Sequence, residues 1–451
     1  MKTPLLDQLL DLLTVAALAL TDPRPRSKFV HLAVGWLCGP KPKTLTSALE
    51  WLDQTQQDWS ADYRLFSQAH WEVSAVFQPV FTQALAHPAC GTNRVYVGQD
   101  DTLLRKTGRH IPGVAYARDP LSPPFQVNLV LGQRFVQTSL LLQPGGPAHP
   151  WRALPVSFSH APTPKIPKQA SPEAQALLKE VRKKHRLSLV ALEQLRFCRQ
   201  HLDRQPGGAQ RHLMDVVDGG YSNRTFFQGL PERTDVVARV RKDAKFRAYL
   251  PPAQRRGARK YGPPLPTPLA SLQDPNLPWQ SMEVFVAGQV RTLRYKERTK
   301  LCWPKVTQAR PMRLILIQAA GYRLRKGSKL LYREPAFLLT TDLTTPAAEL
   351  IAAYLARWEV EVNFRDEKTL LGVGQAQVRS PQSVARAPAF LVAAYAMLLW
   401  SNIRLFGDRR TEAFARLPAW RKTPPARPST RDLIRLLQQE AGQRDLSQMR
   451  N

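Results

Sequence analysis

Apolar residues recur at helical spacing through the first part of the chain. The runs lie at residues 5–20, 44–55 and 63–81, and the last of them is rich in aromatic side chains. Spacings of three and four place such residues on one face of a helix, and breaks such as GPKPK separate the runs. The pattern predicts a mainly helical domain over residues 1–90, built as a small bundle.

Strand-like alternation replaces the helical spacing after residue 91. Short alternating or apolar runs occur at 95–99, 126–131, 135–142, 212–217 and 235–240. Gly132 lies between two of these runs and predicts a hairpin, whereas the Pro-rich stretch 144–172 predicts a loop. A helix is predicted from 172 to 202, so strands, a helix and further strands follow one another. We predict the first half of a mixed α/β core over 91–245.

The remaining chain divides by composition. A Pro-, Arg- and Gly-rich stretch at 251–278 predicts a loop, and strand-like runs follow it up to 337–341. A strongly apolar helix is predicted at 387–399 and a short helix near 431–439. The predicted segments are a β-rich insertion over 246–335, the second half of the core over 336–406 and a basic C-terminal tail over 407–451.

The net charge of the chain indicates what kind of partner it binds. The chain has 65 Lys and Arg against 35 Asp and Glu, a formal net charge of +30, which predicts a polyanionic partner. A ribosomal or chromatin-like binding protein would also be basic, but it does not need 451 residues with 43% hydrophobic content. The cations concentrate in stretches suited to phosphate contacts along a duplex, at 182–186, 239–247, 255–260, 291–300 and 409–422.

The cysteines and the apolar runs exclude other classes of protein. The four cysteines are isolated, without a CxxC pair, which argues against a zinc site and predicts reduced thiols in a cytoplasmic protein. The apolar stretch 9–20 contains Asp11, is too short to span a bilayer and lacks a basic leader with a cleavage site. We therefore expect no membrane association.

The most informative pattern lies in the stretch YLARWEVEVNFRDEK. Tyr354, Arg357, Glu361 and Lys368 follow one another at spacings of three, four and seven. At about 100° per residue the four side chains fall within roughly 60° of one another on a helix. A carboxylate on that face can hold a divalent metal, and the cations can hold phosphates beside it. The alternative is a solvated face with Arg357 and Glu361 as an ion pair.

The spacing Y-x2-R-x3-E-x6-K resembles the motif of a large group of bacterial insertion-sequence transposases. These are DDE enzymes with a ribonuclease H-like catalytic core. The resemblance implies an α/β fold in which this core is interrupted by a β-rich insertion and preceded by an N-terminal helical domain. In the resembling enzymes that helical domain binds transposon ends, and here it could equally be a packing domain. The resemblance also implies two further aspartates upstream, each at the end of a strand.

The sequence supplies both aspartates. Asp100 follows the first predicted strand in an Asp-x-Thr context that resembles the family pattern, and Asp101 remains an alternative. Asp218 follows a short apolar run and precedes Gly219 and Gly220, which leave the backbone free to approach a ligand. A single Asp at a strand end is more often a turn or cap residue. Three acids in the family order are harder to explain in that way.

Several other acids and two tryptophans are also candidates for site residues. We expect acids outside the motif to be structural or solvated, namely Asp215, Asp342, Glu359, Asp366 and Glu367. In the resembling family the insertion helps to flip a base during hairpin formation, and a tryptophan usually assists. Trp279 and Trp303 lie in the corresponding segment, and either could stack on an extruded base or simply pack.

The resemblance implies a DNA transposase that cleaves transposon ends and joins them to target DNA, through hairpin ends in the cut-and-paste manner. Asp100, Asp218 and Glu361 would hold two Mg²⁺ ions, for which Mn²⁺ could substitute, and these ions would stabilise the attacking and leaving oxygens. The other three motif residues would bind the DNA backbone, with phosphate held by Arg357 and Lys368 and the strand positioned by Tyr354.

Double-stranded DNA and a second copy of the chain are the implied partners, since two ends must be paired. The implied location is the bacterial cytoplasm, at the nucleoid when DNA is bound. Two alternatives remain from the sequence. One is a catalytically idle DNA-binding protein of transposase descent, and the other is a related metal-dependent nuclease that cleaves without strand transfer.

Overall fold

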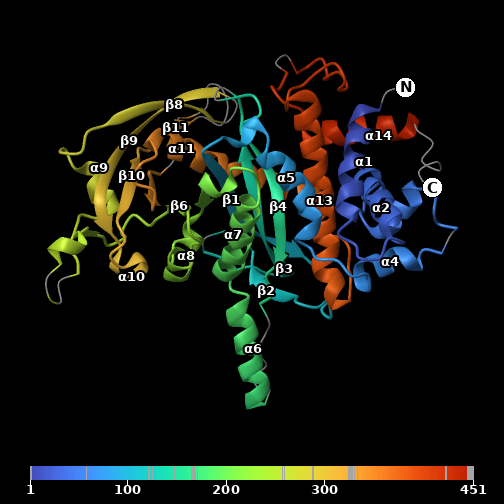
Figure 1. The fold of residues 1–451 in the computed structure, drawn as a ribbon, viewed down its shortest axis with the longest axis horizontal. Helices are drawn as coiled ribbons and strands as arrows, with labels where there is room; N and C mark the ends of the chain where they lie inside the picture. Colours follow the sequence, from blue (N-terminus) through green and yellow to red (C-terminus); the bar gives the residue numbers. More distant parts are fainter. Residues whose placement is uncertain are drawn as a thin grey trace. The chain divides into compact units, whose positions relative to one another are not determined.

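The computed structural model describes residues 3–443 apart from 57, 120–121, 124, 147–148, 164–168, 170, 256, 258–259, 287–288, 323–328, 330, 333 and 422–423. The described chain has the mixed α/β architecture that the sequence predicts (Figure 1). It forms two compact units. Unit 1 comprises Met1–Cys90, Asp100–Gln194 and Glu359–Asn451, and unit 2 comprises Gly91–Gln99 and Leu195–Trp358.

Unit 2 is built on a mixed sheet with parallel strands at one end. The first residues of β1 (Arg94–Arg105) pair in parallel with β5 (His212–Val217), and β5 pairs in parallel with β6 (Thr234–Arg239). Apart from its first residue β5 is buried, as expected for a parallel strand covered on both faces. The register sets Gly98 opposite Val216, so the carboxyl ends of β1 and β5 run toward the same edge.

Antiparallel strands complete the sheet of unit 2. They follow β6 in the order β13 (Ala336–Thr340), β10 (Met312–Ile317), β9 (Gln289–Cys302) and β7 (Arg247–Ala248), and β8 (Gln280–Val286) pairs with β9. A separate pair is formed by β11 (Gly321–Tyr322) and β12 (Leu331–Tyr332). The segment 246–335 is thus rich in strands, as predicted, but the basic composition of 291–300 concealed the length of β9.

Unit 2 also contains α-helices and short 3₁₀ turns. The α-helices are α8 (Arg224–Gln228), α9 (Pro268–Gln273), α10 (Pro304–Thr307), α11 (Ala347–Ala356) and the greater part of α7 (Leu187–Asp203). The 3₁₀ turns are η3 (Gly208–Gln210), η4 (Gly219–Tyr221) and η5 (Pro252–Gln254).

Unit 1 contains a second group of strands. The long strand β3 (Leu129–Leu142) pairs with β2 (Ala115–Arg118) and β4 (Arg152–His160), and it neighbours the last residues of β1. The predicted hairpin at Gly132 is wrong, because β3 runs through this residue and Gly132 lies opposite Ala115. A Cβ atom at Gly132 would lie 2.7 Å from the Leu104 carbonyl oxygen, so the glycine serves a close backbone approach.

Two further expectations for this region need correction. Strand β4 lies inside the stretch predicted as a loop, and its Pro155 sits where the register with β3 shifts, a position that tolerates the missing N–H donor. The single helix predicted over 172–202 is two helices, α6 (Pro172–Lys184) and α7, separated at residues 185–186.

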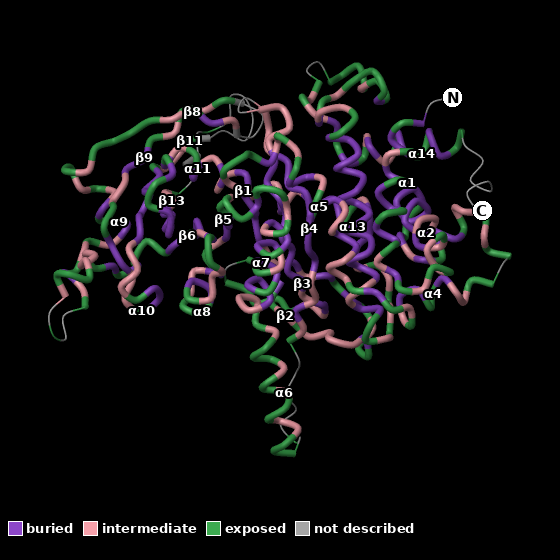
Figure 2. The backbone as a smooth tube through the Cα atoms, in the orientation of Figure 1, coloured by how far each residue is buried: buried purple, intermediate pink, exposed green. Residues whose placement is uncertain are grey.

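Helices pack beside these strands in unit 1. The apolar helix α13 (Pro381–Phe406) contacts β4, α1 and α2, and nineteen of its 26 residues are buried. The other helices of this layer are α1 (Pro4–Ala17), α2 (Arg26–Cys38), α3 (Leu45–Trp51), α4 (Ser60–Ser67), α5 (Gln78–Leu85) and α14 (Thr430–Gln443), with the turns η1 (Ala75–Phe77) and η2 (Pro88–Cys90). The N-terminal and C-terminal helices therefore share one core with α13 (Figure 2).

Helix α13 also bears on the question of a membrane. Among the described residues it is the one helix long and apolar enough to cross a bilayer, and most of its apolar window is buried inside the protein. This burial is what a core helix shows. The length and composition of α13 are explained by its packing in unit 1.

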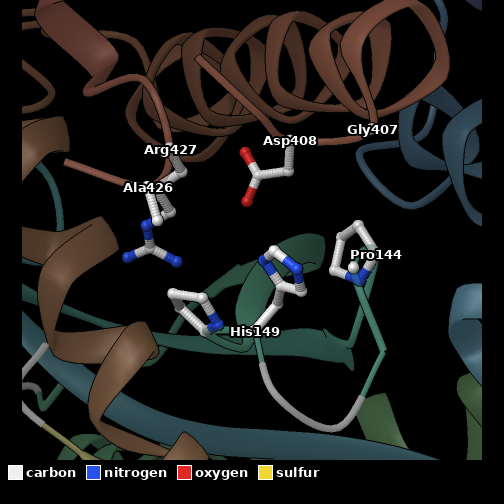
Figure 3. A pocket seen from close by; sticks show the side chains of 8 residues that line it. Pro144, His149, Gly407, Asp408, Ala426 and Arg427 are labelled. Atoms are coloured by element: carbon white, nitrogen blue, oxygen red, sulfur yellow. The ribbon is translucent and has the colours of Figure 1, made fainter. Parts of the chain in front are cut away.

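A buried ion pair ties the end of α13 to β4. The Arg152 guanidinium donates to both carboxylate oxygens of Asp408, at 3.1 and 2.6 Å, and Asn402 Nδ2 donates to Asp408 Oδ1 at 2.7 Å. Asp408 and the nearby Arg427 border a cavity of about 10 Å³, room for one water (Figure 3). Arg152 and Asp408 are both buried, so each depends on the other for compensation of its charge.

A second buried acid has no such cation. Glu367 lies on α12 (Trp358–Thr369) and is almost fully buried beside Gln137 of β3, which hydrogen-bonds to it. Burial raises the pKa of Glu367 to about 8, and the Gln137 hydrogen bond and Lys368 oppose this only in part. At neutral pH the carboxyl group is therefore mainly protonated. The sequence predicts that Glu367 is either structural or solvated, and its burial shows that it is structural and not solvated.

We predict that Arg152→Met destabilises the protein by about 3–5 kcal/mol, because it leaves Asp408 as a buried carboxylate without its cation. Adding Asp408→Asn should recover part of this loss. Asn suits the site because residue 408 has φ 57°, a conformation that Asn tolerates. Urea denaturation followed by tryptophan fluorescence measures both variants. A double variant no more stable than Arg152→Met would contradict the ion-pair argument.

We predict that Glu367→Gln is more stable than the parent at pH 8. In the unfolded chain Glu367 ionises near its ordinary pKa of 4.5, whereas in the folded chain its pKa is about 8. The parent therefore loses stability as the pH rises from about 5 to 8, while the neutral glutamine does not. Denaturation at pH 5, 6.5 and 8 tests this. A stability difference between the two proteins that stays constant with pH would count against it.

Candidate active site

Of the two predicted aspartates, Asp218 follows the parallel strand β5, whereas Asp100 lies within β1. Asp218 comes directly after β5, two residues beyond Val216, and Asp100 lies two residues beyond Gly98, the partner of Val216. The predicted strand 95–99 is too short, since β1 continues to Arg105 and Asp100 lies within it. The strand is longer because residues 100–105 belong to unit 1 and neighbour β3 there.

A glycine turn presents the Asp218 carboxylate. Asp218 is half-buried and caps η4, where its Oδ1 accepts a hydrogen bond from Gly220 N at 2.8 Å. A Cβ atom at Gly220 would lie 3.1 Å from the same oxygen, so a larger residue would crowd the carboxylate. The sequence signal of Asp followed by two glycines therefore corresponds to a carboxylate held at a strand terminus.

Tyr354 and Arg357 come to lie beside Asp218 in unit 2. Burial raises the pKa of Tyr354, the Arg357 and Arg239 cations lower it, and the Asp218 carboxylate raises it. Arg357 also hydrogen-bonds to the phenol. The Tyr354 hydroxyl is therefore influenced electrostatically by two guanidinium groups and by the Asp218 carboxylate. Arg239, at the end of β6, was not singled out from the sequence, although it begins the basic stretch 239–247.

Lys368 lies beside the other aspartate in unit 1. Desolvation lowers the pKa of Lys368, and Glu367, Asp101 and Asp100 raise it, while Arg105 lowers it. Lys368 is exposed, so this desolvation is incomplete, and the attraction of the aspartates keeps the ammonium favourable. Glu361 occupies the first turn of the same helix, α12, seven residues before Lys368 and half-buried.

Asp100 and Asp101 differ in their surroundings. Adjacent residues of a strand point to opposite faces, so the two carboxylates diverge. Asp101 Oδ2 lies 3.5 Å from Nε of Arg134 on the neighbouring strand β3. Asp100 Oδ1 accepts a hydrogen bond from Asp101 N at 2.8 Å. The Arg134 contact gives Asp101 a structural partner, and the choice between the two as first ligand stays a prediction.

The motif face is not a single helix. α11 ends at Ala356, Arg357 is its C-cap, and α12 begins at Trp358. The Arg357 N–H bonds to the Tyr354 carbonyl three residues back, at 3.2 Å, which tightens the chain at this point. The prediction of one continuous helix over 354–368 is therefore wrong. Tyr354 and Arg357 belong to unit 2, whereas Glu361 and Lys368 belong to unit 1.

The described residues contain no group of three or more His, Cys, Asp or Glu side chains arranged to hold a metal ion. Of the three predicted ligands, Asp100 and Glu361 lie in unit 1 and Asp218 in unit 2. Their chemistry fits a hard divalent cation, since all three offer carboxylate oxygens.

The acids expected to be structural have structural contacts. Asp342 accepts hydrogen bonds from the backbone N–H groups of Thr344 and Thr345, Glu359 pairs with Arg427 at 2.6 Å, and Asp366 accepts from the Thr430 hydroxyl at 2.6 Å. Asp215 is fully buried on β5, and burial raises its pKa well above the ordinary value. None of these contacts places the group among the motif residues.

A pocket of about 670 Å³ opens next to the Asp218 turn in unit 2. Its lining includes Gly219, three basic residues at 239, 241 and 242, and the acids Asp243 and Glu334. Trp303 also lines it and packs edge-on against Phe227 and Phe246. Trp279 is elsewhere in the insertion, with Arg294 and Lys296 placed over its ring at 4.8 and 4.6 Å. The structure thus separates the two tryptophans: one lines a basic pocket and the other stacks with cations.

Comparison with known protein families matches residues 19–310 to the DDE superfamily endonuclease family. The matched residues include Asp100, Asp101 and Asp218 and end before the motif helix that carries Glu361. No curated protein matches the chain. Since the match covers most of the sequence, the chain belongs to the DDE superfamily endonuclease family.

Proposed function

We propose that this DDE endonuclease is a transposase of the YREK-motif group that cleaves the ends of a mobile element and joins them to target DNA. The observation that carries the proposal is where the motif residues lie in the folded chain. Asp218 and Arg357 both act on the Tyr354 phenol, and Asp100 acts on the Lys368 ammonium. These groups are far apart in the sequence, and electrostatic coupling of motif residues to both aspartates supports the proposal over a merely solvated helix face.

The proposed chemistry divides the work among these side chains. Asp100, Asp218 and Glu361 together would hold two Mg²⁺ ions, with Mn²⁺ as a substitute, and the ions supply electrostatic stabilisation of the attacking and leaving oxygens. Lys368 and Arg357 bind the non-bridging oxygens of the phosphates beside the cut. Each thereby offsets negative charge that increases in the transition state.

Tyr354 has a positioning role in this proposal. Its raised pKa keeps the phenol protonated, so it donates a hydrogen bond and does not act as a nucleophile. Arg357 fixes the hydroxyl by its own hydrogen bond. The hydroxyl can therefore orient the DNA backbone at Asp218, and strand transfer proceeds without a covalent protein intermediate.

The pocket next to Gly219 supports a cut-and-paste route through hairpin ends. Forming a hairpin requires a base to leave the stack, and a pocket lined by both cations and a tryptophan offers phosphate contacts and a stacking surface to an unpaired nucleotide. Trp303 is the tryptophan that lines this pocket, so we propose it over Trp279 for contact with the extruded base. Pairing of two ends would require a dimer on DNA.

A metal-dependent nuclease that cleaves without strand transfer is the second candidate. The family name of endonuclease favours it directly. Incubation with the DNA that flanks the coding sequence and Mg²⁺, followed by denaturing gel electrophoresis, separates nicks, hairpins and joined products. Nicks alone would support the nuclease, hairpins or joined products the transposase. DNA binding without any cleavage would support an idle descendant.

We predict that Asp100→Asn, Asp218→Asn and Glu361→Gln each lower cleavage at least about a hundredfold, because each removes one anionic ligand from the metal site. Binding of the same DNA in a gel shift should change little. Asp101→Asn is the matched control, because it alters the neighbouring carboxylate that pairs with Arg134. If Asp101→Asn abolishes cleavage and Asp100→Asn does not, the ligand assignment is reversed.

We predict that Lys368→Met lowers the single-turnover cleavage rate about tenfold to a hundredfold while DNA affinity falls by less than about threefold. The reason is that phosphate contact by Lys368 strengthens as charge develops during cleavage. Lys368→Arg should keep part of the rate. Arg365→Met, an exposed residue on the same helix paired with Asp366, is the control for loss of one charge. Equal losses in rate and in affinity for Lys368→Met would argue against the role.

A further inference from the structure

Helix α6 has no buried residue, which sets it apart from the other long helices of unit 1. It projects away from β3 and β4 of the same unit, and its whole length is exposed or intermediate (Figures 1 and 2). Its start is well defined by Ser171, whose hydroxyl accepts a hydrogen bond from Ala174 N, and by Pro172. A thirteen-residue helix is marginal in water without packing, so α6 lacks the usual source of helix stability.

The charges of α6 are segregated around the helix. Lys179, Arg182 and Lys183 follow the spacing i, i+3 and i+4, so they share one face. All three are exposed, and among the described residues none of them forms an ion pair with an acid. Glu173 and Glu180 lie outside this face, because residue 180 is about 100° further round from residue 179. The result is a strip of three exposed cations on a helix that buries none of its residues against the described part of the chain.

We propose that this strip (Lys179, Arg182 and Lys183) is a docking surface for the sugar-phosphate backbone of duplex DNA. The inference rests on the proposed function and adds to it a contact outside the catalytic motif. Charge complementarity identifies the occupant, since three exposed cations on one helix face match a row of phosphates. A second copy of the chain is the poorer occupant, because it would present the same cationic strip and the same net charge of +30.

Such a contact fixes position and carries no base readout. A helix that projects from unit 1 lengthens the footprint on DNA beyond the residues around Asp100 and Lys368. The strip should therefore raise affinity for long duplexes more than for short ones. It should leave the chemical step unchanged once DNA is bound, because none of its residues belongs to the motif.

The test compares the full-length chain with the triple variant Lys179→Gln/Arg182→Gln/Lys183→Gln. Gln keeps helix propensity, and the helix buries nothing, so folding should be preserved and circular dichroism checks it. Affinity for a long duplex is measured at several salt concentrations. The slope of log K against log salt should become less steep by about 3, since each lost phosphate contact removes about 0.9. Single-turnover cleavage at saturating protein should be unchanged.

Neighbouring residues of α6 provide a matched pair. Lys183→Gln and Lys184→Gln make the same charge change on the same helix, but residue 184 lies about 100° away from the strip. We expect the salt slope to become less steep by about 1 for Lys183→Gln and by much less for Lys184→Gln. Equal effects of the two variants would show a diffuse charge effect and overturn the proposal.

Other outcomes distinguish a failure of the α6 contact from a failure of the proposed function. If the parent cleaves and binds DNA but the triple variant keeps its salt slope and affinity, the strip is not a DNA contact while the proposed function stands. If the parent binds no DNA, the proposed function fails. If the triple variant instead changes the sedimentation coefficient of the DNA-free protein, α6 pairs two copies and the DNA assignment is wrong.

Discussion

The parallel pairing of β1 with β5 is the constraint on which the candidate site depends. A parallel pair cannot be closed by a tight turn, so the chain must cross over between the two strands. The crossover here contains β2, β3, β4, α6 and α7. Gly98 and Val216 are paired, and each is followed two residues later by one of the predicted aspartates, Asp100 or Asp218. A slip of one residue would turn one carboxylate to the other face of its strand.

The residues that could be identified from the sequence are those with a local signal. An apolar run without polar alternation, ended by Asp and two glycines, suffices to identify β5 and the Asp218 turn. The spacing of the YREK residues likewise identifies four side chains of related function. The spacing does not reveal that the helix is interrupted at Arg357. The interruption depends on the hydrogen bond from Arg357 N–H to the Tyr354 carbonyl and on packing in two different units. Spacing alone assumes an unbroken helix.

The features that the sequence did not predict are those whose structure depends on contacts between residues far apart in the chain. Gly132 has the local signature of a turn, yet the carbonyl of Leu104 on another strand requires a residue without a side chain there. Strand β4 contains a proline that normally disfavours a strand, and the register shift opposite Ser139 accommodates it. Buried Glu367 could not be recognised either, because the adjacent Asp366 and Lys368 make the stretch RDEK look solvated. In each case the deciding partner lies far away in the sequence.

The motif cations and the aspartates are electrostatically interdependent, which affects how substitutions at the site must be interpreted. Desolvation disfavours the charged form of Lys368, and Asp100 and Asp101 favour it. Neutralising Asp100 therefore removes a carboxylate and also weakens the positive charge of Lys368. The loss measured for Asp100 consequently includes part of the contribution of Lys368, and the two effects cannot be additive. The same reasoning holds for Asp218 with Arg357 and Tyr354, since the carboxylate and the guanidinium act in opposite directions on one phenol. Double-mutant cycles within each unit are the way to separate metal ligation from phosphate binding.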